Sequence, residues 1–319
     1  MKTRALAAAL LLSCAGAFAQ PYPERAVKVI VPFTPGSATD ILGRLTSEQL
    51  AKSLGRPFVV ENRPGASGSI AAGAVAKSAP DGHTLIMVPS TYGTASALYD
   101  SLPYSEAELT PVGLIGSTPY VFVVHPSIPV ASFGELIALL KKNPGKYEFA
   151  SSSPGTAQHL GGELVKRMAG VDMLHVPYKG SAPAMTDLIG GQINYAVETV
   201  ASVVGHVKAG RLKVFGVTTA QRTASLPDVP TLAEAADLPG FDAAAWIGYS
   251  APAGTPREIV VRLSEEIQKA MRGPDMRERY VALGLDQASS TPDEMAAYMV
   301  REQERYATII KNAGIKIQQ

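Results

Sequence analysis

The sequence predicts a two-lobed α/β protein in which each lobe is a mixed, mainly parallel sheet flanked by helices. First, β-branched runs alternate with segments whose apolar residues recur at helical spacing, and such alternation is typical of α/β proteins. Second, about ten strand-like runs are too many for one small sheet. Third, 46% of the 319 residues are hydrophobic, which is ample for a large core.

The first 19 residues have the pattern of a secretory signal peptide. Two basic residues precede the apolar run Ala5–Leu12, which is too short to span a bilayer. Ala17-Phe18-Ala19 then supplies an A-x-A site, so we expect cleavage after Ala19 and an exported mature chain. Cys14 follows Leu-Leu-Ser, which also fits lipoprotein processing, and a lipid anchor at this cysteine is the alternative.

Charge and cysteine content narrow the classes of protein further. Removal of the leader changes the formal net charge from +1 to −1 and removes the one cysteine. A near-neutral chain without a block of five basic residues argues against nucleic-acid binding. No later segment has 18 consecutive apolar residues, so no membrane span is expected. Without a thiol in the mature chain, the core is expected to supply the stability.

Strand-like and helix-like segments follow one another in the first part of the mature chain. Val27–Val31 is β-branched and ends at Pro32, which predicts a strand. Asp40–Leu54 carries apolar residues at helical spacing and predicts a helix. The next predicted elements, separated by turn signals at 62–65 and 81–82, are a strand at Phe58–Val60, a helix at Ile70–Lys77 and a strand at Thr84–Val88.

The same alternation resumes in the second part of the chain. Its predicted strands are Tyr120–Val124, Tyr147–Ser151, Leu174–Pro177, Ile193–Val197 and Leu212–Val217. A helix is predicted at Phe133–Lys142, where Ser132 and Glu135 are spaced as a capping box. Similar start signals, at residues 255–258 and 291–294, predict two helices toward the C-terminus.

Two stretches rich in Gly, Pro and Ser, Thr110–Pro119 and Leu238–Gly254, are the expected crossings between the lobes. If both cross, the C-terminal segment completes the first lobe. The predicted division is therefore a leader at residues 1–19, lobe 1 at residues 20–118 and 247–319, and lobe 2 at residues 119–246.

The chain lacks the local motifs of the common enzyme and metal classes. G-x-G-x-x-G after a strand, the P-loop, H-E-x-x-H, C-x-x-C and G-x-S-x-G are all absent. No two of the five histidines have metal-ligand spacing. No catalytic residue, metal or cofactor is therefore predicted. Two alternatives remain, an exported hydrolase or transferase using His159 or Glu198, and an envelope protein whose cleft binds nothing.

Two similar strand–loop–helix junctions carry the main functional signal. Val31–Asp40 and Ala150–His159 each leave a strand, pass a glycine flanked by Ser and Thr, and enter a helix. Glycine lets a backbone approach a ligand closely, and the unpaired N–H groups of a helix start attract anions. Ligands of open α/β sheets lie at the carboxyl ends of strands. Two such junctions in different lobes predict closure on one small carboxylated molecule, although ordinary caps and turns use the same residues.

Seven segments of the mature chain match a known family in order. They are Tyr22–Arg25, Pro32–Asp40, Glu61–Ala66, Ala79–Gly82, His175–Gly180, Leu226–Thr231 and Ala251–Pro256. Over about 300 residues the chain resembles the periplasmic solute receptors of tripartite tricarboxylate transporters, often called Bug receptors. The resemblance implies a type II periplasmic-binding-protein fold that closes over its ligand.

The resemblance also implies a ligand class and partners. The ligand would be a small carboxylate, which includes di- and tricarboxylates, acidic amino acids and aromatic acids. The receptor, expected to be a monomer, would deliver it to a tripartite tricarboxylate-type membrane permease, and a sensor protein is the alternative partner. The residues that the junctions and the resemblance predict around the ligand are Phe33, Gly36, Ser37, Ala38, Thr39, Asp40, Ser90, Thr91, Ser152, Ser153, Gly155, Thr156, His159, Tyr178, Lys179, Glu198 and Trp246.

Several of these residues also have a structural interpretation. Asp40 and His159 could brace the loops before their helices, Lys179 could be a solvated turn residue, and Trp246 could pack in the core. The chain also departs from the family pattern at two places. Gly36-Ser37-Ala38 stands where the family commonly has consecutive glycines, so the side chains of Ser37 and Ala38 narrow the first loop. Glu198 stands where many members have Asp, and it could shorten the pocket, repel a second ligand acid or hold an amine, which leaves the ligand open.

Overall fold

The computed structural model describes residues 22–98, 101–236 and 244–313, so the predicted leader with Cys14 and the cleavage site after Ala19 lie outside the described residues. Its strands are β1 (Val27–Val31), β2 (Phe58–Asn62), β3 (Thr84–Pro89), β4 (Leu109–Val124), β5 (Glu148–Ser151), β6 (Leu174–Pro177), β7 (Tyr195–Thr199), β8 (Lys213–Val217), β9 (Ala244–Pro252) and β10 (Asp286–Gln287).

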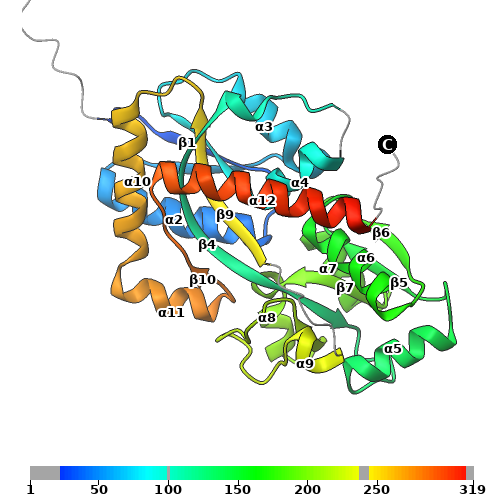
Figure 1. The fold of residues 1–319 in the computed structure, drawn as a ribbon. Coiled ribbons are helices and arrows are strands. Elements are labelled where there is room, and N and C mark those ends of the chain that lie inside the picture. The colour runs from blue at the N-terminus through cyan, green and yellow to red at the C-terminus, as the bar shows by residue number, and fades with distance from the viewer. Residues whose placement is uncertain (1–21, 99–100, 237–243, 314–319) are drawn as a thin grey trace, which may run out of the picture.

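The helices alternate with these strands, as the sequence predicts (Figure 1). They are α2 (Ala38–Leu54), α3 (Ser69–Ala76), α4 (Thr91–Leu98), α5 (Phe133–Lys142), α6 (Ala157–Ala169), α7 (Ser181–Ile189), α8 (Val200–Lys208), α9 (Leu232–Ala236), α10 (Arg257–Met271), α11 (Pro274–Ala282) and α12 (Pro292–Ala313), with short 3-10 turns at Ala66–Gly68 and Glu106–Glu108.

One long strand, β4, joins the two halves of the sheet. The strand order is β2-β1-β3-β9-β4-β7-β5-β6, with β8 and β10 also paired to β4. The strand β4 pairs with β9 through residues 109–119 and with β7 and β8 through residues 120–124. Pairing is parallel for β1 with β2 and β3, and for β5 with β6 and β7, whereas the pairs that involve β4 or β9 are antiparallel. Each half is therefore a mixed sheet, and the halves meet along β4.

The predicted crossing at residues 110–119 is a strand rather than a loop. Gly113 and Gly116 lie inside β4, and a Cβ added there would lie 2.9 Å from the carbonyl oxygens of Ser290 and Asp286, respectively. These glycines therefore allow close packing of backbone against backbone and do not mark a turn. Of the second predicted crossing, residues 238–243 lie outside the described residues, and Ala244–Pro252 is strand β9.

Helices cover both faces of the first half of the sheet. On one face α2 and α10 pack through apolar stripes that include Leu42 and Leu263, against fully buried strand residues such as Val29. On the other face α3, α4 and the start of α12 pack against Ile30 and its neighbours. Because both faces are covered, β1 and β3 consist of nearly continuous apolar residues. The two clusters form the core of this half.

The second half repeats this three-layer plan, and one helix links the two halves. Phe133 of α5 and Leu160 of α6 belong to the core on one face, and residues of α7 and α8 form the core on the other. Met295 of α12 lies in the core of the first half, whereas Tyr306 and Ile310 lie in the core of the second. In Figure 1, α12 runs from the α10 side toward α6 and β6. The predicted lobe boundaries at 118/119 and 246/247 stay a prediction.

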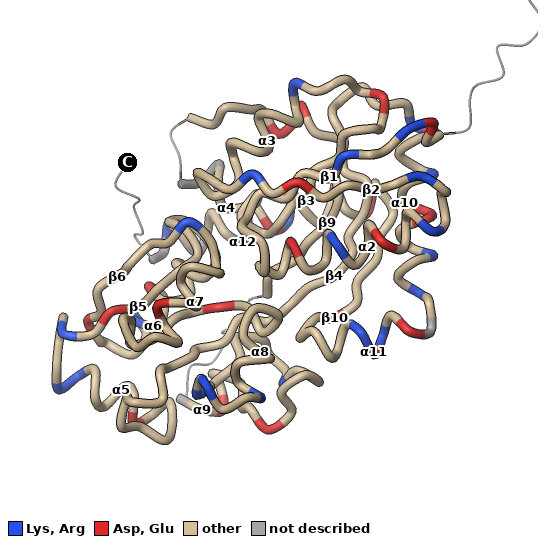
Figure 2. The backbone as a smooth tube through the Cα atoms, turned by 180° about the vertical axis from the view of Figure 1, so that it is seen from behind, with Lys and Arg blue, Asp and Glu red and all other residues tan. Residues whose placement is uncertain are grey.

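Charged residues of both signs are scattered over both halves (Figure 2). Among the described residues, no helix is both long enough and apolar enough to cross a membrane. The same residues include no group of three or more His, Cys, Asp or Glu side chains arranged to hold a metal ion.

Candidate ligand-binding site

A small cavity lies where the two halves face each other. Its volume is about 30 Å³, which is room for two or three water molecules. It is lined by Phe33, Ser37, Ala38, Thr39, Pro89, Ser90, Thr91, Tyr120, Ser152, Gln158, Ser181, Thr199, Ala245 and Ile247. Seven of these are predicted site residues, namely Phe33, Ser37, Ala38, Thr39, Ser90, Thr91 and Ser152.

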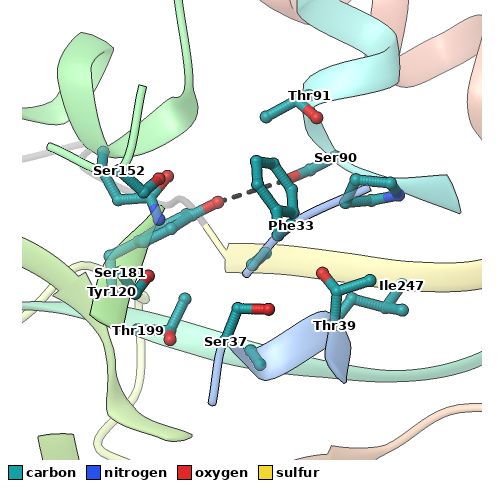
Figure 3. A pocket seen from close by; sticks show the side chains of 14 residues that line it. Phe33, Ser37, Thr39, Ser90, Thr91, Tyr120, Ser152, Ser181, Thr199 and Ile247 are labelled. Atoms are coloured by element: carbon teal, nitrogen blue, oxygen red, sulfur yellow. Dashed lines mark hydrogen bonds between the residues drawn. The ribbon is translucent and has the colours of Figure 1, made fainter. Parts of the chain in front are cut away.

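Hydroxyl groups dominate the polar lining of this cavity. Figure 3 shows them around the ring of Phe33, with Ser152 and Thr199 of the second half facing Ser90 and Thr39 of the first. The hydroxyls of Thr91 and Ser152 are buried and have no hydrogen-bond partner among the described residues. None of the lining residues named above is Lys, Arg or His. The site therefore offers neutral hydrogen-bond groups in place of cationic side chains.

The first predicted loop is held by hydrogen bonds within its own half. Gly36 has φ +83°, Ser37 caps α2, and its Oγ accepts the Asp40 N–H at 3.2 Å. The Gly36 N–H donates to Asp40 Oδ2 at 3.0 Å. Asn62, at the end of β2, donates to the other oxygen of Asp40 at 2.9 Å, and Arg44 forms an ion pair with the carboxylate. Asp40 is 3% exposed and does not line the cavity, so it braces the loop.

The second predicted loop repeats this arrangement with a histidine in place of the aspartate. Gly155 has φ +73°, Thr156 caps α6, and its Oγ1 accepts the His159 N–H at 3.3 Å. The Gly155 N–H donates to His159 Nδ1 at 3.1 Å, four residues along, as Gly36 donates to Asp40. Gly155, Thr156 and His159 therefore shape this loop from behind and do not line the cavity.

A second histidine supports His159 from β6. The two rings stack at 3.9 Å between centroids and 11° between planes, and Nε2 of His175 lies 2.7 Å from Ser151 Oγ. Burial lowers the pKa of His159, and burial together with neighbouring His159 and Lys166 lowers the pKa of His175 to about 3. Both rings are therefore neutral at neutral pH, which leaves Nδ1 of His159 free to accept the Gly155 N–H.

Acidification is expected to destabilise the fold through this stack. The pKa of His175 is about 3 in the folded protein, against 6.5 in the unfolded chain. Neutral His175 therefore contributes its full stability above pH 6.5, and this stability is lost as the pH falls toward the folded pKa. His175→Phe keeps an aromatic ring in the stack but cannot be protonated. We expect the fall in Tm between pH 7 and pH 4 to be smaller in this variant by roughly 3 °C. His125→Phe, outside the stack, is the control, and an equal change in both variants would contradict the assignment.

Direct contacts join the two halves beside the cavity. The Ser67 hydroxyl donates to the Pro154 carbonyl at 2.6 Å and lies 3.1 Å from Ser153 Oγ. The Thr94 hydroxyl donates to the Gly155 carbonyl at 2.9 Å. Ser153, a predicted ligand contact, thus contacts the opposite half instead of lining the cavity. The second loop is therefore clamped by residues of the first half.

Glu198 lies one layer behind the cavity wall. It is fully buried at the end of β7, and its Oε2 accepts hydrogen bonds from the Ser181 hydroxyl at 2.9 Å and the Thr199 N–H at 3.1 Å. Burial raises its pKa to about 7, against the opposing effect of these hydrogen bonds. Glu198 does not line the cavity, whereas Ser181 and Thr199 do.

Three other predicted site residues lie away from the cavity. The Tyr178 hydroxyl donates to Asp187 at 2.7 Å, and Lys179 is exposed. Trp246 is 2% exposed and packs edge-on against Tyr298 at 5.6 Å. Side chains alternate along a strand, so Trp246 points to the opposite face of β9 from its neighbours Ala245 and Ile247, which line the cavity.

Sequence reasoning missed seven lining residues, Pro89, Tyr120, Gln158, Ser181, Thr199, Ala245 and Ile247. Two of them had a usable signal, because Ser181 starts α7 after β6 and Thr199 caps α8 after β7. Both lie at strand-to-helix junctions, which are the positions where α/β proteins place ligands. Whether the other five residues line the cavity depends on strand pairing and on which face of an element is turned inward.

Comparisons with known proteins agree with this architecture. A family model described as "Tripartite tricarboxylate transporter family receptor" matches residues 42–315 of the chain. Protein BugT of Bordetella pertussis is 37% identical over 302 residues, which are 94% of this chain and 92% of BugT.

Two solved structures extend the comparison to the fold. Rpa4515 of R. palustris, solved with adipate, is 35% identical with a TM-score of 0.90, over 92% of this chain and 99% of that protein. MatC of Rhodopseudomonas palustris, with bound malate, is 33% identical with a TM-score of 0.84, over 91% of this chain and all of that protein. Both similarities confirm the predicted two-lobed α/β fold.

Proposed function

The chain belongs to the tripartite tricarboxylate transporter receptor family, and from this we propose that it captures one small carboxylate between its lobes. The observation that carries the proposal is the pair of matched loops, in which Gly36 and Gly155 have positive φ and precede capped helices that meet at one cavity. Each loop presents the N-terminus of a helix, where unpaired N–H groups and the helix dipole favour negative charge.

The lining determines what kind of carboxylate fits. Hydroxyls and helix N-termini donate hydrogen bonds to an anion without supplying full positive charges. Phe33, Pro89 and Ile247 add apolar surface for the body of the ligand. We therefore infer that a mono- or dicarboxylate with an uncharged body is preferred over an anion of higher charge. Binding of adipate by Rpa4515 and of malate by MatC supports this class.

Capture requires the lobes to open and close. A cavity of about 30 Å³ is far smaller than the 300 Å³ or more of typical ligand pockets, so a ligand enters only when the lobes separate. We infer that bending occurs where β4 passes from the first half to the second. The closed form would then be recognised by a membrane permease of the tripartite type, or by a sensor protein as the alternative.

The proposed receptor releases its ligand unchanged. Members of this family act as solute receptors, which supports a binding role over catalysis. Family membership also supports a periplasmic location, which is consistent with the predicted signal peptide. Cleavage after Ala19 remains a prediction.

A carboxylate screen tests the proposal. We expect at least one of succinate, adipate, malate, citrate, glutamate and benzoate to raise the Tm of the mature protein, since ligand at 100 times its Kd adds about 2.7 kcal/mol. Mass spectrometry of the recovered ligand is expected to show no chemical change. If no member of the panel binds, and denatured protein releases no carboxylate acquired from the expression host, the proposed function is wrong.

Thr39→Val tests the site within the same screen. This change removes a lining hydroxyl at nearly constant volume and should weaken the best ligand about tenfold. Thr255→Val makes the same chemical change at a buried hydroxyl bonded to the Pro252 carbonyl, away from the cavity. The control is expected to keep its affinity, and an equal loss in both variants would show that the Thr39 effect is not local.

A further inference from the structure

One buried carboxylate controls two groups of the cavity wall. Both hydrogen bonds of Glu198 reach its Oε2, from the Ser181 hydroxyl and the Thr199 N–H, and both donors belong to lining residues. Its Oε1 is buried and has no hydrogen-bond partner among the described residues. Glu198 therefore acts on the cavity through its neighbours, because its own oxygens do not line it.

The protonation state of Glu198 decides what Ser181 presents to the cavity. An ionised carboxylate only accepts hydrogen bonds, so the single proton of the Ser181 hydroxyl points toward Glu198. Ser181 then offers only lone pairs to a ligand, which is the wrong polarity for a carboxylate. A protonated Glu198 donates to Ser181 Oγ instead, and the Ser181 proton becomes available to the cavity.

We propose that Glu198 is a proton-linked positioning residue: when a ligand carboxylate binds beside Ser181, Glu198 takes one proton from solvent and Ser181 donates its own hydrogen bond to the ligand. The inference rests on the proposed function and adds that binding is favoured on the acidic side of neutrality. It also gives the longer side chain at position 198 a role, since repulsion between two buried carboxylates is removed by the same proton.

The surroundings of Glu198 leave its own carboxyl as the titrating group. The groups that face it are Ser181 of α7, the Thr199 N–H of α8, Gln158 of α6 and the phenol of Tyr120 on β4. None of them is charged near neutral pH, and burial raises the pKa of Tyr120 well above its ordinary value. Burial raises the pKa of Glu198 to about 7, so protonation is available at physiological pH.

The stacked histidines do not provide this proton linkage. Burial lowers the pKa values of both His159 and His175, the latter to about 3, so their protonation is displaced toward acid, away from the range between pH 6 and pH 8. A pH dependence in that range therefore points to Glu198.

Calorimetric titration at pH 6 and pH 8 tests the inference with the panel of carboxylates named above. If only the protonated form binds, the apparent Kd scales with the inverse of its population, so wild-type affinity is expected to be about tenfold weaker at pH 8. Titrations at pH 8 in phosphate and in Tris, which have different ionisation heats, are expected to show uptake of nearly one proton per ligand.

Glu198→Gln should remove this pH dependence. Glutamine is neutral at both pH values. Both hydrogen bonds of Glu198 reach Oε2, so an amide at this position can either accept them with its oxygen or donate to Ser181 with its nitrogen, and in either case its affinity should be equal at pH 6 and pH 8. A difference between the affinities of Glu198→Gln at pH 6 and pH 8 would report the effect of the ligand's own ionisation. Ser181→Ala, which removes the switched donor, should bind weakly at both pH values and with a smaller pH dependence than the wild type.

The possible outcomes separate this inference from the proposed function. Binding that is equal at pH 6 and pH 8 in the wild type, or a pH dependence that Glu198→Gln retains, overturns the proton linkage and leaves the carboxylate receptor in place. Absence of binding by every member of the panel at both pH values, with no carboxylate released from denatured protein, overturns the receptor itself.

Discussion

Replacing Gly180 with alanine is expected to impair closure of the two lobes and weaken ligand binding about 5- to 150-fold. Gly180 precedes α7 in the second half, and a Cβ there would overlap the Thr34 hydroxyl and lie 2.7 Å from the Thr34 methyl group in the first half. Overpacking of this kind costs about 1–3 kcal/mol, and it arises only when the halves are together. Isothermal titration with the best carboxylate of the screen measures the loss.

A second effect of the same change must be separated from closure. Gly180 has φ +135°, which alanine adopts with strain of about 1–3 kcal/mol in open and closed forms alike, so Tm also falls. Gly170→Ala is the matched control, because Gly170 has φ +62° and an added Cβ would meet nothing within 4 Å. It should lower Tm and leave affinity unchanged.

Combining Gly180→Ala with Thr34→Ala removes the overlapping atoms and should restore most of the affinity while Tm stays low. A Gly180→Ala variant that binds like the wild type, or a double variant without recovery, would contradict a role of this contact in closure.

The sequence predicts the fold well where local pattern and long-range pairing agree. Val27–Val31 is a largely β-branched run and becomes an interior strand of the first half. Ser132 caps α5 as expected, whereas the Glu135 carboxylate accepts the Ala131 N–H and not that of Ser132, so only half of the predicted capping box forms. The strand β4 shows where local pattern fails. Its glycines and prolines are typical of a loop. Glycine is nevertheless needed at positions 113 and 116, because the backbone of residues 286–290, which are distant in sequence, packs directly against them. Such a requirement is invisible without the tertiary structure.

The same distinction applies to the candidate site. Glycine followed by a capping residue predicted both loops, because this signal is local. The roles of Asp40 and His159 were left open by the sequence, and the structure makes both of them braces that accept a glycine N–H. Whether a side chain reaches the cavity depends on strand pairing and face, which explains why Trp246 packs away from it while Ile247 lines it.

The two loops thus achieve one backbone shape with different chemistry. An aspartate braces the first loop and is supported by Asn62 and Arg44, whereas a neutral histidine braces the second and is supported by a stacked ring. Protonation of His159 Nδ1 would abolish the second brace, because a protonated ring nitrogen cannot accept the Gly155 N–H. Acid is therefore expected to weaken the second loop.

Asp40→Ala is expected to remove the brace of the first loop and lower the free energy of unfolding by about 2–4 kcal/mol. The change leaves the Gly36 N–H without its acceptor and removes one of the two acceptors of the Asn62 amide, which keeps the Phe33 carbonyl. Hydrogen bonds to a charged group are worth about 1.5–3 kcal/mol each. Ligand affinity should fall at least about tenfold, because Ser37 and Thr39, which line the cavity, belong to the segment that Asp40 holds. Urea denaturation and calorimetric titration measure the two effects.

Arg44→Ala separates the loop brace from the ion pair with Asp40. The Arg44 side chain is 53% exposed, so its loss should cost less than about 1 kcal/mol and leave affinity nearly unchanged. Asp40→Asn keeps one carbonyl acceptor and should fall between Asp40→Ala and the wild type in both measurements. If Arg44→Ala were as damaging as Asp40→Ala, the ion pair and not the Gly36 hydrogen bond would hold the loop. If Asp40→Ala lost stability but kept its affinity, the loop would not depend on its brace to present Ser37 and Thr39 to the ligand.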